Sequence, residues 1–256
     1  MIRRETGSIA FRRAAAAILL CSVGSWAMAD ITPNAKDRTK AAASSSESPP
    51  EKATETSGSK SDTAIDCANL TYGGGKTSRC VAPGFLKEFS AKTEVATTGK
   101  FTAVNLDDEA LFNHPFAIMS GEGAFTLSQA ERDQLKDYLT RGGFLLASAG
   151  CSSAEWSTSF RREIAEIFPD VKLETISISH AIFHTVHDIT KLDTKRRNHV
   201  ATVEGLTVEG RLVVVFSSDG LNDTAAAGGN CCCCGGDEIV NARQINVNIL
   251  AYALTH

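Results

Sequence analysis

The chain has 256 residues, with 26 Lys and Arg against 30 Asp and Glu, and a formal net charge of −4. Beyond its N-terminus it carries no basic stripe, and no run of Lys and Arg is longer than the three residues Lys195-Arg196-Arg197. An acidic chain without such a patch lacks the electrostatic footprint of a nucleic-acid-binding protein, so nucleic acid is excluded as the expected partner.

The first 29 residues have the pattern of a secretory signal peptide. Arg3-Arg4 and Arg12-Arg13 precede an apolar run from Ala14 to Trp26, and Ala27-Met28-Ala29 forms a small-x-small cleavage site. The run is shorter than the roughly 20 apolar residues of a membrane-spanning helix. A lipoprotein signal is also disfavoured, because a leucine precedes Cys21 where a small residue is needed. We therefore expect cleavage at 29, export to the periplasm or extracellular space, and no transmembrane segment in the mature chain.

Residues 30–62 contain a single strongly apolar residue, Ile31, among Ser, Pro, Glu, Lys and Thr. Such a segment cannot bury enough apolar surface to offset the entropy lost on ordering, which predicts a disordered linker. A role as a binding segment is the alternative. Residues 63–256 have the length of one domain with a sizeable core.

From residue 66 onward, short apolar runs alternate with segments of helical spacing. The runs CANLTYGG, FTAVNL, PFAIMS, FLLAS, LETISIS and RLVVVFSS predict strands. The segments VAPGFLKEFSAKT, TLSQAERDQLKDYLTRGG, SFRREIAEIFP and roughly Ile239 to Leu254 predict helices. Ser128 and Glu131 fit a capping box at the start of the second of these helices, and Gly142-Gly143 end it. The alternation predicts an α/β fold, a mostly parallel sheet with helices on both faces.

Ligands of such sheets bind beyond the carboxyl ends of the strands. Three loops are expected there: SGEGAF after PFAIM, SAGCSS after FLLA, and SSDGLND after RLVVVF. The last of these contains Asp219, Asn222 and Asp223, for which turn formation is the expected role.

Several of these segments resemble the bacterial domain-of-unknown-function 4159 family. The resemblance is carried by PFAIMSGEGAFTLSQAERDQLKDYLTRGGFLLAS, SFRREIAEIFP, HAIFH and INVNILAYALT, and it covers nearly all of residues 66–256. It implies a relative of the class I glutamine amidotransferases with a flavodoxin-like sheet, and it implies no settled activity. Gly121-Glu122-Gly123 stands where family members carry a Gly-His-Gly-type loop, and Ser148-Ala149 stands where they often have acidic residues.

Cys151 lies between a predicted strand and a predicted helix, the position of an amidotransferase-like nucleophile. The usual Gly-x-Cys-x-Gly is replaced there by AGCSS, and the alternatives for this cysteine are half of a disulfide or a buried small side chain. A catalytic Cys151 needs a histidine base, for which His180 and His184 are the candidates. Glu122, between two glycines, is a candidate general acid, base or metal ligand, and a solvated loop residue is the alternative.

His180, His184 and His187 would share one face if SHAIFHTVHD were helical, an arrangement that suits a metal. A structural role for the three rings at the edge of the sheet is the favoured interpretation, because Ala181 replaces the Glu of the His-Glu-x-x-His zinc motif.

Four consecutive cysteines lie between two glycine pairs, and they are Cys231, Cys232, Cys233 and Cys234. Seven of the eight cysteines of the chain remain after signal cleavage. In an oxidising compartment, the favoured hypothesis for this cluster is that it forms structural disulfides to Cys67, Cys80 or Cys151. The second hypothesis is zinc or copper held by two of the four thiolates together with a cysteine from elsewhere or a histidine such as His180 or His184. A redox pair comes third, since a disulfide between neighbouring cysteines is strained and readily reduced.

Three functions therefore remain open. The first is an exported binding or scaffold domain whose partner is a protein or a small molecule. The second is a hydrolase or transferase that uses Cys151 with a histidine, and the third is a metal-binding or redox protein centred on the four cysteines.

Overall fold

The protein is described by a computed structural model that covers residues 64–77, 81–194, 198–224 and 238–256. The predicted signal peptide, 1–29, and the predicted linker, 30–62, lie outside the described residues. The strands are β1 (Ile65–Thr71), β2 (Thr97–Asn105), β3 (Phe116–Gly121), β4 (Phe144–Ala149), β5 (Glu174–Thr175), β6 (Glu204–Val208) and β7 (Arg211–Ser217). The helices are α1 (Gly84–Thr93), α2 (Gln129–Thr140), α3 (Ala154–Ile167) and α4 (Ala242–Thr255), with short 3-10 turns η1 (Glu109–Asn113), η2 (Gly150–Ser152) and η3 (Ala181–Phe183).

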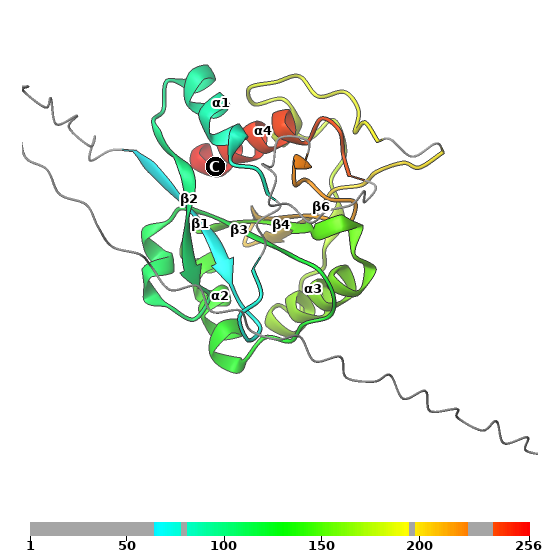
Figure 1. Cartoon of the computed structure of the whole chain (residues 1–256). Helices are drawn as coiled ribbons and strands as arrows, with labels where there is room; N and C mark the ends of the chain where they lie inside the picture. The colour runs from blue at the N-terminus through cyan, green and yellow to red at the C-terminus, as the bar shows by residue number, and fades with distance from the viewer. Residues whose placement is uncertain (1–63, 78–80, 195–197, 225–237) are drawn as a thin grey trace, which may run out of the picture. The chain divides into compact units, whose positions relative to one another are not determined.

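The seven strands form one sheet in the order β2-β1-β3-β4-β7-β6-β5 (Figure 1). The first five of these are parallel, whereas β6 and β5 pair antiparallel with their neighbours. Every residue of β3 and β4 is buried, as expected for central strands covered on both faces. The predicted α/β fold with a mostly parallel sheet is confirmed.

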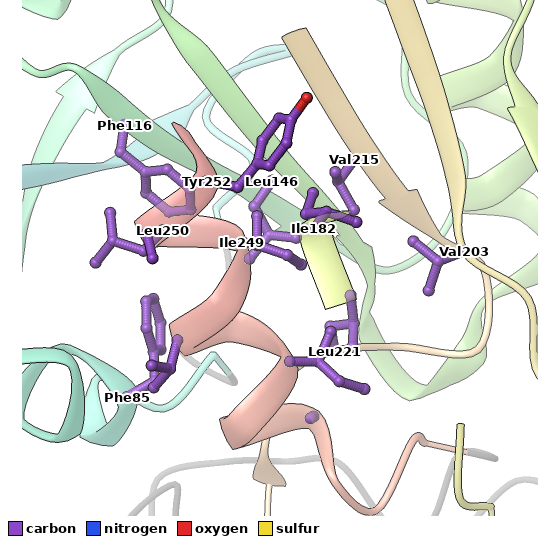
Figure 2. Close-up of a cluster of buried hydrophobic side chains, with 14 of the residues drawn as sticks. Phe85, Phe116, Leu146, Ile182, Val203, Val215, Leu221, Ile249, Leu250 and Tyr252 are labelled. Atoms are coloured by element: carbon purple, nitrogen blue, oxygen red, sulfur yellow. The ribbon is translucent and has the colours of Figure 1, made fainter. Parts of the chain in front are cut away.

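Two hydrophobic cores lie on the two faces of the sheet. One is built from α1, α4 and η3, and Phe85 and Leu250 from the two helices pack there with Phe116 and Leu146 of the sheet (Figure 2). The other holds the apolar stripes of α2 and α3, including Leu135. The sheet is therefore the middle layer of a three-layer domain.

The predicted capping box at the start of α2 is present. The Ser128 hydroxyl accepts from the Glu131 backbone N–H at 3.2 Å, and the Glu131 carboxylate accepts from the Ser128 backbone N–H at 2.7 Å. The other Glu131 oxygen accepts from the backbone N–H of Gly73, at 2.7 Å. This buried carboxylate therefore also attaches the loop after β1 to α2.

Several elements differ from the sequence prediction. α3 begins at Ala154 and not at Ser159, where the predicted helix began. LETISIS forms only the two-residue strand β5. α4 begins at Ala242 rather than near Ile239, whose backbone bonds to the loop after β7 instead. The histidine segment contains the 3-10 turn η3 and not a longer helix, so the helix on which the three rings would share one face is not formed.

Within the part of the chain that the structure describes, no helix is long and apolar enough to span a bilayer.

Substitution of the two glycines after α2 is expected to lower the free energy of unfolding by different amounts. A Cβ at Gly143 would lie 2.4 Å from the buried ring of Tyr138, whereas a Cβ at Gly142 meets open space. Gly143→Ala is expected to lower the free energy of unfolding by about 2 kcal/mol through overpacking. The matched control Gly142→Ala, where φ is +113°, should cost only about 1 kcal/mol from backbone strain. Urea denaturation measures both, and equal effects would contradict the role of Tyr138.

Candidate functional site

The carboxyl ends of four neighbouring parallel strands meet at one edge of the sheet. β1 ends at Thr71, β3 at Gly121, β4 at Ala149 and β7 at Ser217. The loops that leave these strands therefore lie at the edge where α/β sheets bind ligands. We take this carboxyl edge as the candidate site.

Cys151 lies in a sharp turn between β4 and α3. Its backbone is left-handed, with φ 49° and ψ 31°, and Ser152 follows with φ 52°. Such a conformation costs a non-glycine residue about 1–3 kcal/mol, which the surrounding structure must supply. Ser153 then caps α3 through its hydroxyl. The half-buried Cys151 thus lies on a strand-to-helix elbow beside a helix N-terminus.

The elbow is held close to the loop after β3. A Cβ at Gly150 would lie 2.9 Å from the carbonyl oxygen of Gly121, so only glycine fits there without a shift. The Ser153 hydroxyl also accepts from the backbone N–H of Gly123 at 3.1 Å. Two neighbouring loops of the carboxyl edge are therefore joined before any ligand binds.

Asn222, in the loop after β7, is fully buried at the centre of the carboxyl edge. Its side-chain oxygen accepts from the hydroxyls of Ser120 at 3.2 Å and Ser148 at 2.8 Å. Its side-chain nitrogen donates to the Ala149 carbonyl at 2.9 Å and to Glu238 at 3.1 Å. This one amide therefore ties together the ends of β3, β4 and β7 and the start of the segment leading to α4.

The observed role of Asn222 differs from the turn formation expected from the sequence. The hydrogen bonds of its side chain reach residues from 16 to 102 positions away. A sequence pattern identifies such a residue only as a polar residue in a loop, because its hydrogen-bond partners come from strands that are distant along the chain.

His199 and Asp219 form a second polar contact at this edge. His199 Nε2 pairs with one Asp219 carboxylate oxygen, and the backbone N–H of Thr202 donates to the other at 3.2 Å. The Asp219 carbonyl oxygen accepts from the Ser152 hydroxyl at 2.7 Å. The pair therefore lies beside the elbow that holds Cys151. Sequence reasoning missed His199, which sits in a polar segment with no periodic pattern.

A family profile described as a domain of unknown function, DUF4159, matches residues 66–254. The chain belongs to the DUF4159 family. No protein of the curated collection matches the chain. The family resemblance seen in the sequence is thereby confirmed.

The three predicted histidines of this DUF4159 domain have separate partners. His180 Nδ1 accepts from the Ile182 backbone N–H at 3.1 Å, and burial lowers the pKa of its ring. His184 contacts the Asp188 carboxylate at 2.5 Å and the Ile178 carbonyl at 2.8 Å. The hydrogen bond to Asp188 raises the pKa of His184, although its ring is exposed.

His187 lies 3.1 Å from the carboxylate of Glu88 on α1. Its backbone and that of Val186 are bonded to the side chain of Asn248 on α4. Each ring thus serves a local contact, in line with the structural role favoured for the three histidines.

No cluster of three His, Cys, Asp or Glu side chains suited to a metal ion occurs within the described ranges of the DUF4159 domain. His180 and His184 are therefore not joined there by a third ligand.

The cysteine cluster lies outside the described residues, and this holds for each of Cys231, Cys232, Cys233 and Cys234. Cys80, one of their expected disulfide partners, also lies outside them. The disulfides, the zinc or copper site and the redox pair predicted for the four cysteines therefore stay predictions.

The remaining predicted residues have distinct environments in the DUF4159 domain. Glu122 is exposed in the loop after β3. Cys67 is fully buried in β1, and desolvation together with the neighbouring Asp66 charge raises the pKa of its thiol to about 12. No disulfide joins Cys67 to Cys151. The Cys67 thiol is therefore shielded from solvent.

Proposed function

We propose that this protein is an exported, class I glutamine amidotransferase-like binding domain that engages a partner protein through its carboxyl edge. The relationship to amidotransferases is supported by the parallel order of β1-β3-β4-β7 and by a cysteine at the turn between β4 and α3. The family itself carries no assigned activity, so the binding role rests on the geometry of the edge.

The observation that supports the binding role is that the polar side chains at the strand ends are hydrogen-bonded within the protein. Ser120 and Ser148 point into the buried network of Asn222 and satisfy its oxygen. Ser148 occupies a position where the family resemblance implies acidic residues. Hydroxyls held in this way stabilise the loops and are not available as acid, base or metal ligand.

The exposed part of the edge consists of loops that project from this network. Gly74 and Gly75, after β1, have positive φ of 80° and 101° and open space around them. The Lys76 ammonium donates to the Glu122 carbonyl at 3.3 Å, which joins this loop to the one after β3. Exposed loops positioned by a rigid scaffold are typical of a recognition surface.

Site-specific photocrosslinking in the exporting cell tests this proposal. A benzophenone amino acid replaces Glu122 in one variant, and in the control it replaces Glu166, an exposed residue of α3. A partner bound at the carboxyl edge gives a discrete adduct at 122 and none at 166. Absence of an adduct at 122, or the same adducts at both positions, would refute the binding role.

A second candidate function is a hydrolase or transferase in which Cys151 is the nucleophile. The left-handed elbow of Cys151 favours it, because nucleophiles of α/β hydrolytic enzymes sit on such strained strand-to-helix turns. The His199–Asp219 pair, which reaches the elbow through Ser152, is the candidate base. His184, the base considered from the sequence, is instead engaged by Asp188 and the Ile178 carbonyl.

The rate of alkylation of Cys151 distinguishes the two functions. In a variant with Cys80 and all four cluster cysteines changed to Ser, Cys151 is the accessible thiol, because Cys67 is buried. A nucleophile should react with iodoacetamide with a pH midpoint well below the ordinary thiol pKa of about 8.5. His199→Asn should then raise that midpoint. An ordinary midpoint that does not respond to His199→Asn would eliminate the enzymatic function.

Export and disulfide formation belong to the same proposal. The arginine pairs, the apolar run and Ala27-Met28-Ala29 support cleavage of a signal peptide. Because Cys67 is buried with a raised thiol pKa, we expect a cysteine of 231–234 to pair with Cys80 or Cys151 instead.

Sequencing and peptide mapping of the exported protein check this expectation. The mature N-terminus should be Asp30, and a non-reducing map should contain a peptide of the 231–234 segment linked to Cys80 or Cys151. If all four cluster cysteines are alkylated without reduction, the disulfide is ruled out. If they become reactive only after a chelator is added, a metal takes its place.

A further inference from the structure

β5 is the last strand of the sheet at the margin opposite β2, next to β6. Glu174 and Thr175 are both exposed, and among the described residues no strand pairs with the outer side of β5. The chain from 171 to 177 contains no helix, no turn and no residue with positive φ. An extended edge of this kind is a template for pairing with another strand.

The backbone groups that face outward at this edge follow from the pairing with β6. Glu174 lies opposite Gly205, and the Ile176 N–H donates to the Val203 carbonyl at 2.8 Å. In an antiparallel pair the residues that bond to one neighbour alternate with those that face away. The N–H and C=O groups of Thr175, and of Leu173 if the alternation continues, therefore point away from β6.

The charges along this edge in one copy of the chain complement those of the same edge in a second copy. Lys172 and Glu174 are exposed on either side of Leu173. If a second copy pairs antiparallel about Leu173, each Lys172 lies opposite a Glu174 of the other copy. These two pairs fall at the positions without backbone hydrogen bonds, where opposite side chains approach most closely. In the same register the Thr175 N–H of one copy meets the Val171 carbonyl of the other, while the Val171 N–H stays bonded to the Phe168 carbonyl at 3.2 Å.

Hollows lie on both faces of the sheet beside this edge. One, of about 470 Å³, is lined by Glu174, Gly205 and Leu212 on the α4 face. The other, of about 260 Å³, is lined by Ile164 and Leu173 on the α3 face. Val171 and Lys172 line both. Side chains of an added strand alternate between the two faces, so both hollows can receive them.

We propose that two copies of this chain associate through β5, antiparallel about Leu173, so that their sheets join across a twofold axis. The occupant is a second copy because the charge pattern of residues 172–174 matches itself in this register. An unrelated partner strand would need the same alternation of charge to fit this edge. A lysine that only protects the edge from pairing would not need an acidic residue two positions away, where Glu174 stands.

Charge-reversal variants of the full chain test the register. Sedimentation velocity over a dilution series should show a reversible dimer for the unaltered protein. Lys172→Glu alone, or Glu174→Lys alone, should raise the dissociation constant by about tenfold or more, because each turns two attractive pairs into repulsive ones. An equimolar mixture of the two single variants should dimerise again, and so should the double variant.

Lys136→Glu, an exposed charge reversal on α2, is the matched control and should dimerise as the unaltered protein does. A monomer at every concentration would overturn the proposal and leave the charges as protection of the edge. A dimer that neither single variant weakens, or a mixture that fails to restore it, would also overturn it. Circular dichroism of each variant separates loss of pairing from loss of the fold.

Discussion

Asn222→Leu is expected to lower the free energy of unfolding by about 4 kcal/mol. The substitution nearly conserves volume, so the loss comes from hydrogen bonds and not from a cavity. It leaves two buried serine hydroxyls without their acceptor and removes the donor to Ala149 and Glu238. Each buried group left unsatisfied costs about 1–3 kcal/mol. Urea denaturation followed by circular dichroism measures the change.

Ser120→Ala is the matched control for Asn222→Leu. Its hydroxyl makes one of the bonds in the network, at 3.2 Å, and its loss leaves the Asn222 oxygen with the shorter bond from Ser148. We expect a cost of about 1 kcal/mol. If Asn222→Leu costs no more than Ser120→Ala, the amide does not hold the carboxyl edge together.

Glu163→Gln is expected to cost about 3 kcal/mol. The Glu163 side chain on α3 is 1% exposed, and each of its oxygens lies 2.8 Å from an arginine, Arg132 on α2 and Arg162 on α3. The carboxylate is buried, while the Arg132 and Arg162 side chains are 23% and 46% exposed, so solvent compensates only part of the charge left when the carboxylate is removed. Glutamine keeps the shape, so the measurement isolates the charge that joins the two helices.

Glu166→Gln, one helical turn further along α3, is the control for this charge removal. Its side chain is exposed, so the change in the free energy of unfolding should stay within about 0.5 kcal/mol. Denaturation midpoints of the two variants compare the sites directly. Equal midpoints for Glu163→Gln and Glu166→Gln would mean that the arginines are satisfied by solvent once the carboxylate is gone.

The positions of most elements could be predicted because local signals agree with burial. FLLAS and PFAIMS are continuous apolar runs, and both became strands buried on each face. Ser128 and Glu131 predicted the start of α2, because their capping box joins residues only three positions apart. Such contacts depend on spacing along the chain, which a sequence displays directly.

LETISIS shows the limit of such signals. Its alternation is that of a full strand, yet only Glu174 and Thr175 pair with β6. The edge of a sheet offers a partner on one side alone, so the alternation by itself does not decide how far the pairing extends.

The candidate site was only partly accessible from the sequence. The strand-to-helix position of Cys151 followed from the order of elements, but its left-handed backbone did not. His184 was singled out by spacing, whereas His199, which lies beside the elbow through Asp219, had no pattern to mark it.

The sequence by itself determined the α/β class, the alternation of strands and helices and the loops that meet at the carboxyl edge. These follow from hydrophobic periodicity and from turn residues, which act over a few positions. Only the tertiary structure decided that Asn222 is buried, that His199 meets Asp219 and that Glu163 binds two arginines. Those contacts depend on which strands and helices become neighbours, and a polar residue acquires its partner only when the sheet has assembled around it.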